Sequence, residues 1–256
     1  ESIRFLISTG RIAEAEAIVQ HAEQIALQKV KSLAPVTNKV KVPSRRGKIK
    51  MSEPFSVMFN KYKKRIVLSW TLNFTETWPY YSAFSIFPLI FEKFYGVSVA
   101  KVGLLLGIIL GAGVVGVLVW AYLLDIIGRR PVLIITYGMS GLLFIILGII
   151  TPYLTFAEFV ITLSIVYFFT YAAAALLYPQ IEEIFPTEAR SSGVGTAIGF
   201  GRLGGIIAPF VLLALMPHGL LYVFAVTGIM LIIGSIAEIL LGPEFKKVSL
   251  EISSKV

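Results

Sequence analysis

Residues 125–131 read Asp-Ile-Ile-Gly-Arg-Arg-Pro and join two long apolar runs, at 102–124 and 131–150. The whole chain of 256 residues is 56% hydrophobic and has a mean hydropathy of +0.82, which is above the range of ordinary soluble domains. Both runs have the length of a helix that crosses the hydrocarbon core of a membrane, about 20 residues. A charged turn between two such runs predicts a short loop at a membrane surface.

Further apolar runs lie on both sides of this turn. They are expected to be helices, because every backbone amide inside lipid must find a partner within its own segment. We therefore predict an all-α membrane protein with six transmembrane helices, near residues 65–91, 102–124, 131–150, 156–177, 192–216 and 220–241. The predicted domains are a cytoplasmic segment with an amphipathic helix and a basic linker (1–64), a six-helix bundle (65–241) and a cytoplasmic tail (242–256).

The positive charge lies almost entirely in the first quarter of the chain. Residues 1–65 hold 14 Lys and Arg against 5 Asp and Glu, whereas the rest holds 9 against 10. Basic residues collect in loops that stay cytoplasmic, so we expect a multi-pass protein of the cell membrane with both ends of this segment in the cytoplasm. The same argument disfavours nucleic acid as a partner of the basic charge and leaves the lipid bilayer as the expected one. The basic linker either contacts anionic lipid headgroups or is a solvated tether.

The chain also lacks the sequence signatures of common enzymes. It has no cysteine, no phosphate-cradling Gly-Lys-Ser/Thr loop, no His-Glu-x-x-His zinc site and no Gly-x-Ser-x-Gly nucleophile turn. We therefore expect neither enzymatic activity nor a cofactor nor a metal site.

A second charged loop, at 183–190, reads Glu-Ile-Phe-Pro-Thr-Glu-Ala-Arg. Pro186 ends the preceding helix, and the charges of this loop can pair with those of the first loop across the cytoplasmic face. Exposed ion pairs are weak, which suits a gate that opens and closes; the alternative is two solvated loops with no further role. The candidate gate residues are Asp125, Gly128, Arg129, Arg130, Glu182, Glu183, Glu188 and Arg190.

A third phrase, at 201–209, reads Gly-Arg-Leu-Gly-Gly-Ile-Ile-Ala-Pro, and residues 1–11 read Glu-Ser-Ile-Arg-Phe-Leu-Ile-Ser-Thr-Gly-Arg. With the two loops, these phrases resemble the central loop, cytoplasmic loops and eleventh helix of major facilitator superfamily transporters, in the sugar, metabolite and organic-ion branch. The resemblance implies the C-terminal six-helix half of a twelve-helix bundle, an N-terminal six-helix half as partner, and a gating role for both loops. The chain begins at Glu1 rather than Met, and we expect it to be part of a longer protein.

Glu76 lies near the middle of the first apolar run. A charge at membrane depth is costly unless it is paired, hydrated or protonated, so it usually marks a functional site. Asn73, Thr77 and Tyr80 lie on the same helical face, and Pro79 interrupts the helix. These features predict a substrate or proton site near the midplane; the alternative is a glutamate bonded to a neighbouring helix.

Arg202 lies about ten residues into the run at 192–216, also near mid-depth. Because a guanidinium is always charged, it must face an anion, a carbonyl or water. Arg202 either binds a substrate carboxylate or pairs with Glu76 and tunes its proton affinity; the alternative is a role in packing alone. The predicted site comprises Asn73, Glu76, Thr77, Tyr80 and Arg202.

Glycines recur every four residues in two of the runs, and small residues at that spacing allow close helix packing. We expect contacts within one bundle from Gly103, Gly107, Gly111, Gly195, Gly199, Gly201 and Gly205. Glu158 and Glu238 lie near the ends of runs, and both are expected to reach a membrane interface.

These observations predict a secondary active transporter of a small organic metabolite, coupled to protons and working by alternating access. The helix-seven pattern of the sugar porters is missing, since Asn73 lies too far from Tyr80 and Tyr81, which disfavours a hexose. The opposite charges of Glu76 and Arg202 favour an organic acid or another charged metabolite. The alternatives are a sugar porter, or a transporter-like solute sensor or scaffold.

Overall fold

The computed structural model describes residues 3–28, 58–186 and 189–243. It divides into two compact units, Glu1–Glu53 and Pro54–Val256, and each is described by itself. The predicted basic linker, the tail beyond residue 243 and the gate candidate Glu188 lie outside the described residues.

The first unit contains helices α1 (Ile3–Ser8) and α2 (Ile12–Leu27). Gly10 joins them with a φ of 82°, a conformation that glycine adopts without steric cost. In the first turn of α2, Arg11 donates a 2.7 Å hydrogen bond to the carboxylate of Glu14. This bond holds the pKa of Glu14 below its usual range.

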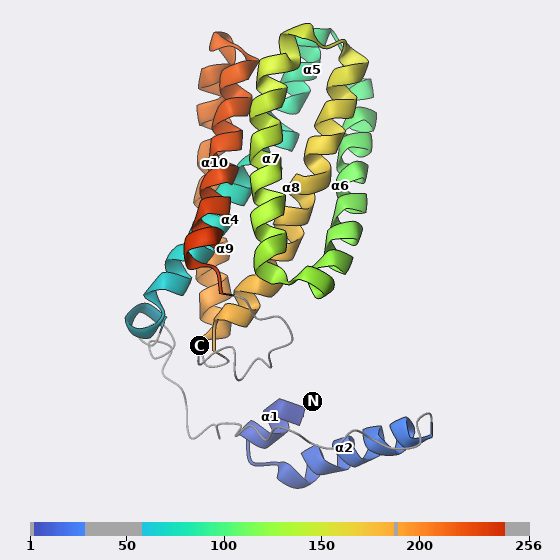
Figure 1. Cartoon of the computed structure of the whole chain (residues 1–256), viewed down its shortest axis with the longest axis vertical. Coiled ribbons are helices and arrows are strands. Elements are labelled where there is room, and N and C mark those ends of the chain that lie inside the picture. The colour runs from blue at the N-terminus through green and yellow to red at the C-terminus, as the bar shows by residue number, and fades with distance from the viewer. Residues whose placement is uncertain (1–2, 29–57, 187–188, 244–256) are drawn as a thin grey trace. The chain divides into compact units, whose positions relative to one another are not determined.

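The second unit is a bundle of long helices (Figure 1). Its helices are α4 (Lys63–Ser85), α5 (Phe87–Tyr95), α6 (Val99–Ile127), α7 (Arg129–Ile150), α8 (Phe156–Ile184), α9 (Arg190–Leu215) and α10 (Leu220–Leu241). Five of them, α6 to α10, are long and apolar enough to cross a membrane. No strand occurs in the residues that the structure describes, so the predicted all-helical membrane fold is confirmed.

The first span differs from the prediction of one helix over 65–91, because the chain forms two helices there. α4 ends at Ser85, and Pro88 in the first turn of α5 favours a new helix start at that point. α4 has 23 residues, but it carries Glu76 and a basic first turn, and it is not one of the five clearly apolar spans. The turn predicted at Gly128 is present, with a φ of 105° between α6 and α7.

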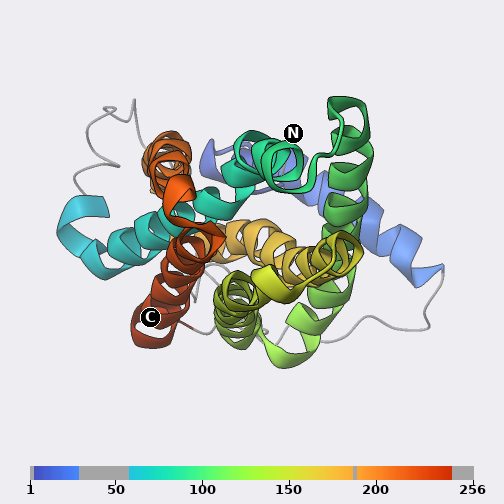
Figure 2. The same cartoon turned by 90° about the horizontal axis from the view of Figure 1, so that it is seen from above.

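Three helix pairs make the most extensive contacts: α7 with α10, α4 with α9, and α6 with α8. Figure 2 looks along the bundle and shows α8 in its middle, where it contacts α4, α6, α7 and α9. This arrangement places polar side chains of α4, α8 and α9 next to one another inside the bundle.

Glycines at two of these contacts leave no room for a side chain. A Cβ on Gly141 of α7 would lie 2.6 Å from the carbonyl oxygen of Gly228 on α10, and Gly116 of α6 faces the backbone of Phe168 on α8. The predicted contacts of Gly201 and Gly205 are confirmed, since both face α4. For the other five the contacts stay a prediction, because a Cβ there meets no atom within 4 Å in the described bundle: Gly103, Gly107, Gly111, Gly195 and Gly199.

Gly116→Ala is expected to destabilise the bundle by about 1–3 kcal/mol, because the new methyl group meets backbone atoms that cannot rotate away. The matched control is Gly107→Ala on the same helix, where a Cβ meets no atom within 4 Å. Thermal unfolding of the detergent-solubilised protein measures both variants. Equal melting temperatures for the two would contradict the close packing of α6 against α8.

The two glutamates predicted at membrane interfaces behave differently. Glu158 is exposed and forms a capping box with Thr155 at the start of α8, as expected for a helix end. The prediction is wrong for Glu238, which is fully buried in α10 and accepts a 2.5 Å hydrogen bond from Gln180 of α8. A buried carboxylate needs such a donor, and Gln180 of α8 supplies it.

Candidate functional site

A pocket of about 290 Å³ opens between α4, α8 and α9. All five residues of the predicted site line it, although Arg202 is more than 120 positions from the others in sequence. The full lining is Asn73, Glu76, Thr77, Tyr80, Tyr81, Tyr171, Ala174, Ala175, Tyr178, Ile198 and Arg202. The pocket thus combines one carboxylate, one guanidinium and four phenol rings.

Glu76 is the buried acid of this pocket, with only 5% of its surface exposed. Its carboxylate makes no hydrogen bond or ion pair with any residue of 58–186 or 189–243. The structure therefore does not show the alternative of a glutamate bonded to a neighbouring helix. A buried carboxylate without a partner is costly when ionised, so this position favours proton or ligand binding.

Arg202 is exposed and donates a hydrogen bond from Nη1 to the hydroxyl of Tyr81. Its guanidinium carbon also lies 5.7 Å from the centre of the Tyr81 ring. Gly205, one turn further along α9, leaves the space that this ring occupies. In the described bundle Arg202 makes no ion pair with Glu76, so the two opposite charges line one pocket without direct contact.

The other predicted site residues are tied to the backbone. Asn73 donates a 3.0 Å hydrogen bond to the Ser69 carbonyl, and Thr77 donates to the carbonyl of Gly201 at 2.9 Å. Thr77 therefore joins α4 to α9 directly beside Arg202. Tyr80 is 38% exposed, and its ring stacks on that of Tyr171 at a centroid distance of 6.2 Å.

Two ion pairs occur at the candidate gate among the described residues, and one of them joins the two loops as predicted. Nε of Arg129 lies 3.1 Å from Oε2 of Glu183, and both side chains are about four-fifths buried. Asp125 lies 3.8 Å from Arg129 but is 80% exposed, so this pair is the weaker one. Arg130 instead donates to the Ile239 carbonyl of α10 at 2.7 Å.

The remaining gate candidates lie at the ends of the same helices. Glu182 is exposed in the last turn of α8, and Arg190 is half-buried at the start of α9. Gly128 forms the turn that brings Arg129 to the end of α8.

The family model described as "Sugar (and other) transporter" matches residues 1–256. The chain belongs to this family of the major facilitator superfamily. It is 28% identical to "Niacin transporter NiaP" of Acinetobacter baylyi, over 98% of this chain and 55% of that protein. It is also 28% identical to "Inner membrane metabolite transport protein YdjE" of Escherichia coli, over 100% of this chain and 56% of that protein. The chain spans about half the length of the curated relatives it matches.

The family consists of membrane transporters rather than enzymes, which agrees with the loops and phrases that suggested it. The predicted site nevertheless leaves out the α8 side of the pocket. Tyr171, Ala174, Ala175 and Tyr178 follow the i, i+3, i+4, i+7 spacing of one helical face, and this pattern could have marked the pocket side of α8. Nothing in the sequence paired Tyr81 with Arg202, because the contact joins two distant helices.

Sequence reasoning also missed a residue that lies beside the candidate gate. Arg65, in the first turn of α4, donates a 2.5 Å hydrogen bond to the Ile184 carbonyl at the end of α8. Basic side chains satisfy the free carbonyls of helix C-termini in this way. Arg65 thus links the helix that carries Glu76 to the helix that carries Glu183.

Proposed function

We propose that the chain forms one half of a secondary active transporter that couples uptake of a small organic acid to protons. The observation that carries this proposal is the buried carboxylate of Glu76, unpaired among the described residues, in one pocket with the guanidinium of Arg202. Ionisable groups at membrane depth mark proton and substrate pathways. The family membership and the metabolite-transporter relatives support the same assignment.

In this proposal α4 and α5 together form the first of six membrane-spanning segments, before α6 to α10. An N-terminal six-helix half faces them, and the two halves rock about the pocket in alternating access. The basic loops place both ends of this segment in the cytoplasm of a cell-membrane protein. On that side, the Arg129–Glu183 pair forms part of the gate.

The substrate is an organic anion with a flat apolar body. Arg202 presents the planar fork of donors that matches a carboxylate, and the rings of Tyr80, Tyr81, Tyr171 and Tyr178 favour an aromatic or unsaturated ring. A pocket of about 290 Å³ fits a small metabolite. One relative is named a niacin transporter, and a ring carboxylate of that kind agrees with this lining.

Glu76 acts as the proton carrier. When Glu76 is protonated, the pocket holds no buried negative charge beside the substrate carboxylate, so proton and anion bind together favourably. When the proton leaves, repulsion between the two carboxylates favours release of the substrate. Through these charge interactions, substrate transport is coupled to proton transport.

Transport by the protein at its native length tests this function. We expect the native mass to be about twice the 28.1 kDa of this chain. In proteoliposomes, an inward proton gradient is expected to drive uptake of ring carboxylates such as nicotinate, and an uncoupler to abolish it. Saturable binding of these compounds without flux would instead indicate a solute sensor, and absence of both would contradict the proposal.

The gate is tested by exchanging its charges. Arg129→Glu and Glu183→Arg are each expected to reduce uptake about three- to tenfold, because the largely buried pair becomes a pair of like charges. The double variant is expected to recover most of the activity. The matched control is Asp125→Asn, whose exposed side chain is expected to change uptake less than about twofold. Failure of the double variant to recover would show that the pairing itself has no role.

A further inference from the structure

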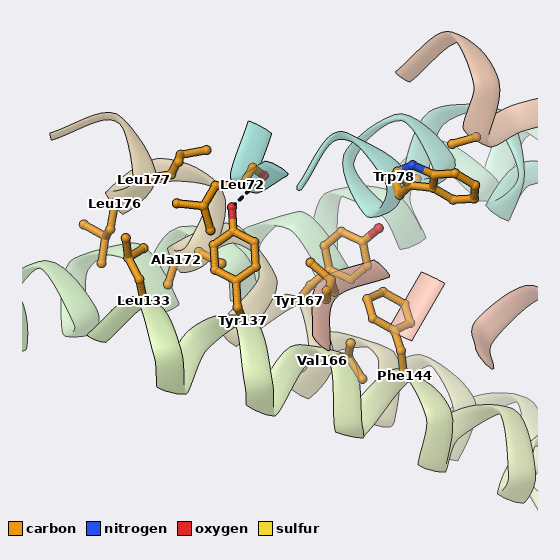
Figure 3. Close-up of a cluster of buried hydrophobic side chains, with 14 of the residues drawn as sticks. Leu72, Trp78, Leu133, Tyr137, Phe144, Val166, Tyr167, Ala172, Leu176 and Leu177 are labelled. Atoms are coloured by element: carbon orange, nitrogen blue, oxygen red, sulfur yellow. Dashed lines mark hydrogen bonds between the residues drawn. The ribbon is translucent and has the colours of Figure 1, made fainter. Parts of the chain in front are cut away.

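Two buried tyrosines bond to the helix that carries Glu76, one before this residue and one after it. Figure 3 shows both rings and the bond from Tyr137 to Leu72. Tyr137 of α7 donates a 3.0 Å hydrogen bond to the carbonyl of Leu72, one turn before Glu76. Tyr167 of α8 donates a 2.7 Å hydrogen bond to the carbonyl of Pro79, nearly one turn after it. Both tyrosines are fully buried, and neither lines the pocket.

A third hydrogen bond joins the same segment to α9. The hydroxyl of Thr77 donates to the Gly201 carbonyl of α9 at 2.9 Å, and Gly204 lets α9 approach the Phe74 carbonyl closely. Three helices, α7, α8 and α9, are therefore each joined to α4 by a hydrogen bond between residues 72 and 79. Glu76 lies in the middle of this segment.

This segment is also where α4 has the least support of its own. Pro79 has no N–H group, so the Thr75 carbonyl lacks its usual helical donor. The hydroxyl of Thr75 bonds back to the Thr71 carbonyl at 2.9 Å, a contact that often bends helices. Since none of the described residues makes a hydrogen bond or ion pair with the Glu76 carboxylate, its direction depends on the rotation of this weakened backbone.

We propose that Tyr137 and Tyr167 are positioning residues that direct the Glu76 carboxylate into the pocket by holding the α4 backbone. The inference rests on the proposed role of Glu76 as proton carrier. A bound proton and substrate require the site to be held within about 0.5 Å, and two hydroxyls on either side of Glu76 restrict both bending and rotation of α4. The competing explanation is that each hydroxyl merely needs an acceptor in an apolar core.

Tyr137→Phe and Tyr167→Phe test the proposal, because each removes one hydroxyl and leaves the ring that packs in the core. In the native-length transporter, each is expected to raise KM or shift the pH of half-maximal uptake, with KM changing about three- to tenfold, the range of a single hydrogen bond. The melting temperature is expected to stay close to that of the wild type. The double variant is expected to exceed the product of the single effects, since α4 is then free on both sides.

Two matched control variants show whether the effect depends on where the lost hydroxyl lies or on the loss of any hydroxyl. Tyr153→Phe removes a hydroxyl from an 85% exposed ring. Thr227→Val removes a buried hydroxyl that bonds only within its own helix, to the Val223 carbonyl at 2.9 Å. Neither is expected to change KM or the pH profile. Tyrosine variants that lower the melting temperature but keep the wild-type KM and pH profile would overturn the proposal.

A labelling experiment tests the positioning without relying on transport. This chain contains no cysteine, so Glu76→Cys places a single thiol in it at the position in question. We expect Tyr137→Phe or Tyr167→Phe to change the rate at which a small thiol reagent modifies this cysteine by at least about threefold. An unchanged labelling rate would overturn the proposal. If the tyrosine variants change this rate but the wild-type protein shows no transport, only the proposed function is refuted.

Discussion

Glu76→Gln is expected to abolish proton-driven uptake, with a loss of at least about 100-fold, the effect of a charge-carrying residue at membrane depth. Glutamine resembles the protonated acid in shape and charge, so the pocket can still receive the substrate anion. It cannot release a proton, and the step that depends on deprotonation is lost. Exchange of labelled for unlabelled substrate across the membrane is therefore expected to persist in this variant.

The two assays together identify the role of Glu76. Proton-driven uptake and exchange are measured in the same proteoliposomes, with Glu158→Gln as the control. Glu158 is also a glutamate of a membrane-spanning helix, but it caps the exposed start of α8, so its replacement is expected to change neither assay by more than about twofold. Normal proton-driven uptake by Glu76→Gln would exclude this residue as the proton carrier.

Arg202→Ala is expected to weaken binding of a carboxylate substrate by at least about 30-fold, because the anion loses its only cationic partner among the described pocket residues. Arg202→Lys is expected to be intermediate, since an ammonium group keeps the charge but not the two-pronged geometry. Equilibrium binding to the purified transporter measures both variants.

A change in the ligand provides the control for Arg202. The uncharged carboxamide of the same ring compound cannot use the guanidinium charge, so its affinity is expected to change less than about threefold in Arg202→Ala. The four affinities form a cycle that isolates the charge interaction from any change in pocket shape. Equal losses for the carboxylate and the carboxamide would mean that Arg202 only supports the pocket structure.

Several parts of the pocket could be predicted because they depend on helical spacing alone. Asn73, Glu76, Thr77 and Tyr80 line the same pocket, as residues three and four positions apart on one helix must share a face. The same rule applied to α8 would have added Tyr171 and Tyr178. That these residues bind substrate and proton stays a prediction.

Other features could not be predicted because they depend on which helices become neighbours. Glu238 lies near the end of an apolar run, yet it is buried, because α8 brings Gln180 against it. The glycine spacing of 103, 107 and 111 resembles a packing motif, but the glycines of α6 that contact α8 are Gly113 and Gly116. Spacing along a helix defines a face without saying which helix covers it.

The sequence by itself determined the membrane class, the helical architecture and the transporter family. Hydrophobicity, loop charges and short phrases are local, and lipid leaves the backbone almost no alternative to the helix. Only the tertiary structure decided that Arg202 contacts Tyr81, that Arg65 contacts the end of α8, and that Glu76 is buried in the pocket. It also decided that Tyr137 and Tyr167 hold the helix around Glu76. These contacts join residues about 65 to 121 positions apart, and they exist only after the close packing of the helices has fixed which side chains meet.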